Sequence, residues 1–168
     1  MSTQPDVPHM LQQMVSHLQS LLKERNIADP LMIGIHTGGV WIAEFLHQAL
    51  AIQDPLGSLN ITFYRDDFSR MGMHPQVQPS QLPFAIEDRH IILVDDVLHT
   101  GRTIRAALNE IFDYGRPASV ILAALIERNG KELPICADVV GQVLNLNLEQ
   151  HVKLTGPEPL ATVILGDA

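Results

Sequence analysis

Cysteine is almost absent from the sequence, since Cys136 is the only one among 168 residues. A lone cysteine can form no disulfide within the chain, and it lacks the partners of a thiolate metal site. Disulfides persist in oxidising compartments, so this composition favours the reducing cytoplasm. Neither a disulfide nor a structural metal is needed, because a chain of this length buries about 70% of its unfolded surface.

Long hydrophobic runs and a secretory leader are also missing. No stretch approaches the roughly 20 consecutive apolar residues that a membrane helix requires. The first ten residues, MSTQPDVPHM, contain neither a charged n-region nor an apolar h-region. We therefore expect a soluble protein.

Positive charge is scarce, with 11 Lys and Arg residues against 19 Asp and Glu residues and a formal net charge of -8. This balance argues against the basic surface of a typical nucleic-acid-binding domain. The positive charge is nevertheless concentrated, because five of the eleven cations are Arg102, Arg105, Arg116, Arg128 and Lys131. Such a concentration in an acidic protein indicates an anionic ligand.

Hydrophobic periodicity predicts alternating helices and strands. Helices are expected at 7–23, 40–50 and 104–112, and strands at 31–35, 59–64, 90–94 and 118–126, with short strands around 139, 152 and 163. The strand at 59–64 alternates apolar and polar residues, as a strand with one wet face does. The alternation predicts an α/β fold with a mostly parallel central sheet flanked by helices, in a single domain over 1–168.

The segment from 94 to 103, VDDVLHTGRT, is the most informative part of the sequence. An apolar strand ends at two acids, Asp95 and Asp96, and a small-residue turn then opens a helix. In open α/β sheets, ligands bind beyond the carboxyl ends of the strands, and the first turn of a helix offers unpaired N–H groups to an anion. Carboxylates beside a phosphate site suit the hydroxyl groups of a ribose, so these residues indicate a sugar phosphate.

This segment resembles the PRPP-binding signature of type I phosphoribosyltransferases. The resemblance implies that Asp95 and Asp96 bind the ribose hydroxyls and act in catalysis. It also implies that the turn holds the 5-phosphate through Val97, Leu98, His99, Thr100, Gly101, Arg102 and Thr103. The alternative from the residues alone is an ordinary strand–turn–helix unit with two solvated acids.

Further segments resemble one subfamily, PyrR, whose members regulate the pyrimidine operon and have uracil phosphoribosyltransferase activity. These segments are YRDDF at 64–68, GRPAS at 115–119, ELPI at 132–135 and Ala137-Asp138, and the resemblance covers about residues 10–142.

The resemblance assigns roles to three other regions. His36, Thr37, Gly38 and Gly39 occupy the pyrophosphate-binding loop, where the family often has an arginine at the position of Gly38, so one contact is absent or supplied elsewhere. Residues 65–83 correspond to a flexible loop, in which Arg65 could reach the pyrophosphate or pair with a neighbouring acid. Residues 128–168, with the amino-terminal segment, correspond to a small hood over the base, where Arg128 either contacts the substrate or lies on a solvated loop.

The reaction that the resemblance implies is uracil plus PRPP giving UMP and pyrophosphate, with Mg²⁺ carried by PRPP. A second hypothesis is an RNA-binding attenuation protein that senses UMP or UTP, although the first helix has no arginine before Arg25. A purine substrate and a non-catalytic nucleotide-binding scaffold are further alternatives. The resemblance also implies a homo-oligomer, either a dimer or a tetramer.

Overall fold

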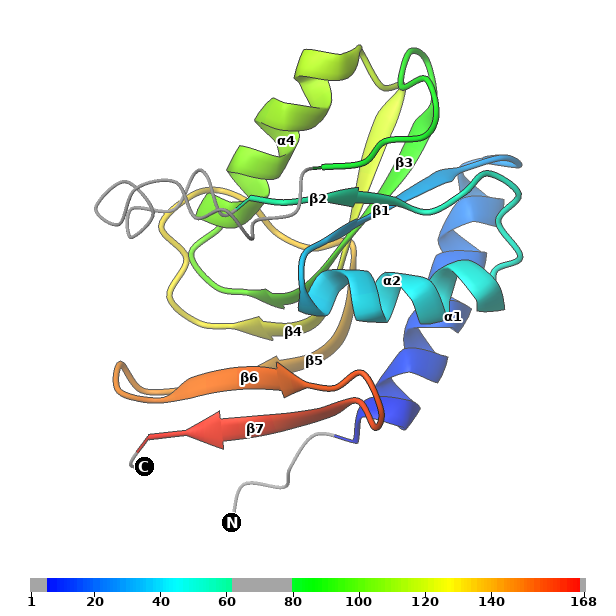
Figure 1. Cartoon of the computed structure of the whole chain (residues 1–168). Helices are drawn as coiled ribbons and strands as arrows, with labels where there is room; N and C mark the ends of the chain where they lie inside the picture. The colour runs from blue at the N-terminus through cyan, green and yellow to red at the C-terminus, as the bar shows by residue number, and fades with distance from the viewer. Residues whose placement is uncertain (1–5, 62–79, 167–168) are drawn as a thin grey trace.

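The computed structural model describes residues 6–61 and 80–166, which form helices and strands in alternation (Figure 1). The described helices are α1 (Val7–Glu24), α2 (Gly38–Ala49) and α4 (Arg102–Tyr114). The described strands are β1 (Leu31–Ile35), β2 (Gly57–Leu59), β3 (His90–Leu98), β4 (Ser119–Arg128), β5 (Val139–Leu144), β6 (His151–Thr155) and β7 (Ala161–Leu165). None of these helices is long and apolar enough to span a membrane.

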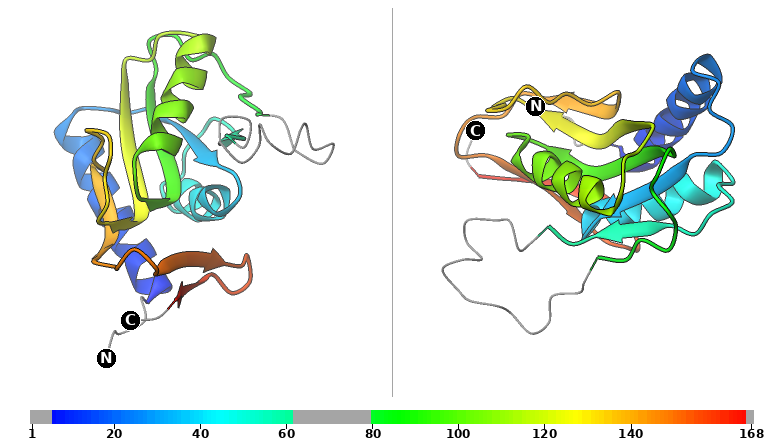
Figure 2. Two further views of the ribbon diagram at one scale, coloured as in Figure 1. Left: turned by 90° about the vertical axis from the view of Figure 1, so that its left-hand side faces the viewer. Right: turned by 90° about the horizontal axis from the view of Figure 1, so that it is seen from above.

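Five parallel strands form the central sheet in the order β2-β1-β3-β4-β5. Alternate side chains of one strand enter opposite layers: Ile92 and Val94 join the core under α1 and α2, whereas Ile91 and Leu93 join the core under α4. Figures 1 and 2 show these helices on the two sides of the sheet. Because both faces are covered, the strands are nearly continuous apolar runs. The predicted α/β architecture is confirmed.

In its described part, the strand expected at 59–64 is confirmed only at Leu59 and is wrong at residues 60 and 61. β2 spans only Gly57–Leu59, and Asn60 and Ile61 follow it without strand structure. Both of these residues are buried, so this stretch has no wet face. The backbone N–H of Asn60 donates to the hydroxyl of Ser80, and Ser58 pairs with Gln81. Residues 62–64, and most of the loop expected at 65–83, lie outside the described ranges.

A two-stranded antiparallel hairpin, β6–β7, follows the central sheet. Its inner face packs on the same core as α1, because Leu154 is buried there and Val152 lies against it. The start of α1 lies beside this hairpin in Figures 1 and 2. The carboxyl-terminal segment therefore covers one end of the molecule, where it meets the amino-terminal helix.

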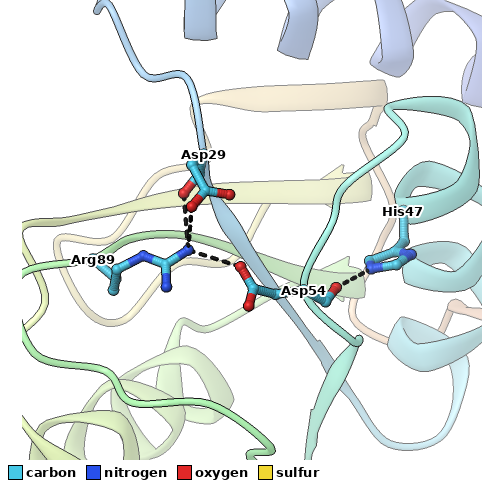
Figure 3. A network of polar contacts seen from close by, with 4 residues as sticks. All are labelled: Asp29, His47, Asp54 and Arg89. Atoms are coloured by element: carbon cyan, nitrogen blue, oxygen red, sulfur yellow. Dashed lines mark hydrogen bonds and ion pairs between the residues drawn. The ribbon is translucent and has the colours of Figure 1, made fainter.

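An ion-pair network joins the loops that precede three strands of the sheet (Figure 3). Nη2 of Arg89 donates to Oδ2 of Asp29 at 3.1 Å and to Oδ2 of Asp54 at 2.9 Å. Asp29 precedes β1, Asp54 precedes β2 and Arg89 precedes β3, so one guanidinium aligns the amino ends of all three. Nε2 of His47 donates to the carbonyl of Asp54 at 2.7 Å, which ties α2 to the same network.

We expect Arg89→Ala to lower the free energy of unfolding by about 1–2 kcal/mol, because two partly exposed ion pairs that share one cation are lost. The matched control is Arg105→Ala, an exposed arginine on α4, whose effect should stay within about 0.5 kcal/mol. Urea denaturation measures both variants. The difference should shrink in about 1 M salt, where the Debye length falls to about 3 Å. Equal losses in the two variants would contradict a stabilising role for the network.

Candidate functional site

The site lies where the strand order reverses. After β1 the chain moves through α2 to β2 on one side, and then crosses to β3 on the other side of β1. Ligands of open α/β sheets bind at this switch point, outside the carboxyl ends of the strands. Here a cleft of about 600 Å³ opens beside the carboxyl ends of β1 and β3. It is lined by His36, Thr37, Gly38, Trp41, Asp95, Asp96, Val97, His99, Thr103, Val152, Lys153 and Leu154.

The two acids at the end of β3 are held by their own backbone. Oδ1 of Asp95 accepts from the N–H of Asp96, and Oδ1 of Asp96 accepts from the N–H of Val97, both at 2.8 Å. Asp95 is buried, with 5% of its surface exposed. An unsatisfied buried carboxylate is costly, so these bonds stabilise the pair in position. A carboxylate has about four acceptor positions. Asp96 can therefore accept further hydrogen bonds from the hydroxyl groups of a ligand in the cleft.

The glycine turn after β1 packs directly on this acid pair. A Cβ atom at Gly38 would overlap the Oδ2 of Asp96, and one at Gly39 would lie 2.7 Å from the carbonyl oxygen of Val94. The peptide between His36 and Thr37 is cis, and the N–H of His36 donates to the carbonyl of Leu59 at 2.9 Å. In this arrangement position 38 has no room for a side chain, so the turn offers backbone groups to a ligand.

The turn after β3 leads into α4 and has the form of an anion site. Gly101 has a φ of 95°, in the left-handed region, and α4 begins at Arg102. The N–H of Arg102 donates to the Oγ1 of Thr100 at 3.2 Å. The first turn of α4 keeps unpaired N–H groups, and its dipole favours an anion beside Thr103. The carbonyl of Thr100 accepts from the N–H groups of Glu132 and Leu133, which ties this turn to the segment after β4.

Several predicted residues do not line the cleft. Leu98 is buried in the core beneath α4, so its side chain faces away from a ligand. The Nε of Arg102 donates to Glu132 at 3.0 Å, and the side chain is 65% exposed. Gly39 and Gly101 support the turns through their backbone, and Thr100 does so through both its carbonyl and its Oγ1. Arg65 lies outside the described residues.

Arg128 lies buried at the wall of a second cavity. Only 5% of its surface is exposed, so the alternative of a solvated loop is wrong. Its guanidinium donates to the carbonyls of Gln150 at 2.8 Å and Asn147 at 3.2 Å. The side chain of Asn129 makes two further bonds, one to the N–H and one to the carbonyl of Leu146. Arg128 and Asn129 therefore clamp the segment 146–150 against the end of β4.

A second cavity of about 490 Å³ adjoins the cleft at His99, which lines both. Its walls are His99, Arg128, Asn129, Gly130, Leu146, Asn147, Leu148 and Glu149. Gly130 has a φ of 110°, and a Cβ there would lie 2.9 Å from the Nε2 of His99. The clamped segment thus forms the far wall of a cavity that opens beside the acid pair.

Both histidines of the cleft have lowered pKa values. Burial lowers the pKa of His36, and Glu44 opposes this effect. Burial also lowers the pKa of His99, with Arg128 acting in the same direction and Glu132 opposing it. A pKa below the ordinary value of about 6.5 makes both imidazoles predominantly neutral at neutral pH. Neither one therefore contributes a full positive charge toward an anion.

Part of the cleft has no local signal in the sequence. Trp41 lies on α2 at a helical spacing that is typical of packing, and it does pack on the core, but it also lines the cleft. Val152, Lys153 and Leu154 come from β6, far along the chain from the signature. Within the described ranges, no group of three or more His, Cys, Asp or Glu side chains could hold a metal ion.

The paired acids, the turn into α4 and the 36–39 turn meet at the switch point of a parallel α/β sheet. The Phosphoribosyl transferase domain family matches residues 6–157. The relatives include the Bifunctional protein PyrR of Nitrosococcus oceani, 64% identical over 157 residues, which cover 92% of this chain and 89% of that protein. Another is the Bifunctional protein PyrR of Pseudomonas aeruginosa, 58% identical, with 94% and 92% covered. The chain therefore belongs to the phosphoribosyltransferase family and, within it, to the PyrR proteins.

Solved structures support the same fold at much lower identity. A hypoxanthine-guanine-xanthine phosphoribosyltransferase has a TM-score of 0.61 and 22% identity, over 83% of this chain and 76% of that one. A Trypanosoma cruzi hypoxanthine phosphoribosyl transferase has a TM-score of 0.64 and 19% identity, over 85% and 77%. At such identity these likenesses concern the fold alone.

We expect Glu132→Gln to lower the pKa of His99 further, because Glu132 is the group that raises it against burial and Arg128. An NMR titration of the imidazole signals measures this change. The pKa of His36 is the internal control, since its opposing partner is Glu44 and it should not move. A lowered pKa means that the folded state binds fewer protons than the unfolded state, so stability rises with pH up to about 6.5. An unchanged His99 would contradict the assigned electrostatics.

Proposed function

We propose that this chain transfers the phosphoribosyl group of PRPP to uracil, giving UMP and pyrophosphate. The observation that carries this proposal is the common cleft of three parts: the acid pair Asp95 and Asp96, the turn that opens α4, and the glycine turn at 36–39. Membership of the PyrR proteins favours uracil over a purine as the acceptor base. The purine enzymes among the structural neighbours share only the fold.

In the proposed complex, Asp95 and Asp96 accept hydrogen bonds from the ribose hydroxyls, and the turn at 99–103 receives the 5-phosphate. The backbone of the 36–39 turn faces the pyrophosphate. Mg²⁺ arrives with PRPP, as it commonly does when substrate phosphates supply most of its ligands. In this proposal, the loop at 65–83, which includes Arg65, covers the reacting centre.

Catalysis in this proposal is mainly electrostatic. The bond between C1 of the ribose and the pyrophosphate breaks, and positive charge develops on the sugar. Carboxylates already fixed beside that charge stabilise it without reorganising, which is the strongest way in which a site lowers a barrier. Covering the cleft excludes water, which would otherwise hydrolyse the activated sugar.

We place the base in the cavity that adjoins the cleft at His99. Its walls include the backbone of Gly130 and Leu148, and through His99 it adjoins the cleft that contains the acid pair. Uracil presents alternating donors and acceptors, which backbone N–H and carbonyl groups can match. Arg128 acts here by fixing the wall through Asn147 and Gln150.

The proposal also covers the domain organisation, the oligomeric state and RNA binding. We propose one domain over 1–168, in which the β6–β7 hairpin, the preceding segment from 128 and the start of α1 form the hood. Phe112 and Tyr114, each 56% exposed on α4, favour a homo-oligomer, either a dimer or a tetramer. RNA binding is the second function of this proposal, and the exposed Arg105 and Arg116 are its basic residues. Lys131 is less available to it, because it pairs with Glu127.

The decisive measurement is pyrophosphate release from Mg²⁺ and PRPP with uracil, hypoxanthine, adenine and orotate supplied separately. We expect turnover with uracil, and a loss of about 100- to 1,000-fold in kcat in the double variant Asp95→Asn/Asp96→Asn, since the fixed charges that stabilise the transition state are removed. Turnover with a purine instead would contradict the assignment of the base. No turnover with any base, together with measurable UMP binding, would favour the UMP-sensing regulator.

A further inference from the structure

The cleft is poor in positive charge for a site that receives a phosphate and a pyrophosphate. Asp95 and Asp96 contribute carboxylates, and the burial of His36 and His99 favours their neutral forms. Among the described residues that line the cleft, Lys153 is the one lysine or arginine. Mg²⁺ neutralises only part of a pyrophosphate, so a cation from the protein is needed as well.

Other cations near the cleft are already engaged. Arg102 pairs with Glu132, and Lys131 pairs with Glu127. Arg128 is buried and donates to backbone carbonyls. Lys153, in contrast, is exposed, and it has no ion pair with any residue of the ranges 6–61 and 80–166. Its ammonium group is therefore available to an anion in the cleft.

The course of β6 places Lys153 between the two turns of the site. At one end of the strand, the charge of His151 acts on His99. Beyond the other end, an ideal Cβ at Gly156 would lie 3.3 Å from Cε3 of Trp41, so the chain there lies against α2. β6 thus runs from the turn after β3 toward the helix that follows the 36–39 turn.

Val152, Lys153 and Leu154 of β6 all line the cleft, and Lys153 is the charged residue among them. Val152 and Leu154 pack toward the core, and successive side chains of a strand point to opposite faces. Lys153 therefore points away from the core, and it lines the cleft. The 36–39 turn contains no cation of its own, and a side chain at Gly38 would collide with Asp96. The positive charge for a group bound at that turn must come from another element.

We propose that Lys153 binds the pyrophosphate group of PRPP, supplying from β6 the positive charge that the 36–39 turn lacks. This inference rests on the proposed function and assigns a further substrate-binding residue to it. Lysine suits the role, because its ammonium is a compact charge on a flexible stem that can follow a group as it leaves. The 5-phosphate is served separately by the N-terminus of α4, on the other side of the acid pair.

Equilibrium binding separates the two phosphate positions, because UMP contains only the 5-phosphate. Calorimetry would compare Mg²⁺–pyrophosphate, Mg²⁺–PRPP and UMP on the full chain, on Lys153→Ala and on Lys153→Arg. We expect Lys153→Ala to weaken Mg²⁺–pyrophosphate and Mg²⁺–PRPP by about 10-fold or more, the effect of one charge-assisted hydrogen bond. UMP affinity should change by less than about twofold, and Lys153→Arg should retain most of the affinity.

The matched control is Lys23→Ala, an exposed lysine in the last turn of α1, which should bind all three ligands like the unaltered chain. Thermal unfolding of each variant verifies that the fold is intact. A parallel loss of UMP affinity in Lys153→Ala would overturn the pyrophosphate assignment in favour of the 5-phosphate. Unchanged affinities would overturn the inference while leaving the proposed function standing, provided that the unaltered chain binds Mg²⁺–PRPP. Failure of the unaltered chain to bind PRPP or pyrophosphate would overturn both.

Discussion

The pairing of β1 with β3 determines where every other part of the site lies. Leu31 pairs with Ile91 and Gly34 with Val94, so β1 ends beside the acid pair of β3, which continues to Leu98. Parallel pairing brings both carboxyl ends to the same edge, and the chain leaves them in opposite directions along the sheet. The turn after β1 therefore faces Asp95 and Asp96 of β3 at contact distance. Arg89 supports this register from the other end, because it joins the loops that precede β1, β2 and β3.

This close approach explains a conflict of charge within the site. In the proposed complex the acids lie near the ribose, and the same acids repel the phosphates on either side of it. Backbone N–H groups at the 36–39 turn and at the start of α4 offer partial positive charge without bulk, which suits a narrow gap beside Asp96. A full cation must come from a greater distance, and the hairpin beyond the sheet is the described element that provides one. The close approach of the 36–39 turn to Asp96 thus leaves no room for a cation on that turn, and it accounts for the role proposed for Lys153.

Much of this arrangement could be predicted from the sequence, because its determinants are local. The apolar strand, the two acids and the turn into α4 follow one another between His90 and Arg102, and the glycine turn directly follows β1. Trp41 and Lys153 could not be predicted in the same way, since their places depend on how α2 and β6 cross the end of the sheet. The strand expected at 59–64 is wrong at residues 60 and 61 for a related reason: Asn60 is buried by tertiary contact, which the alternation of residue types does not reveal.

Arg128 shows how the two ends of the cleft depend on each other. The resemblance predicts that Arg128 contacts the substrate, and the structure shows its buried guanidinium bound to the carbonyls of Asn147 and Gln150 at the wall of the second cavity. Those carbonyls belong to the segment that leads directly into β6, so the clamp that forms the wall of the second cavity also sets where β6 begins. A buried arginine bound to carbonyls gains little from charge alone, because its desolvation is costly. Its fixed fork of donors instead gives the segment one orientation. The position of Lys153, three residues beyond Gln150, then follows from the same contact that positions the wall of the base cavity.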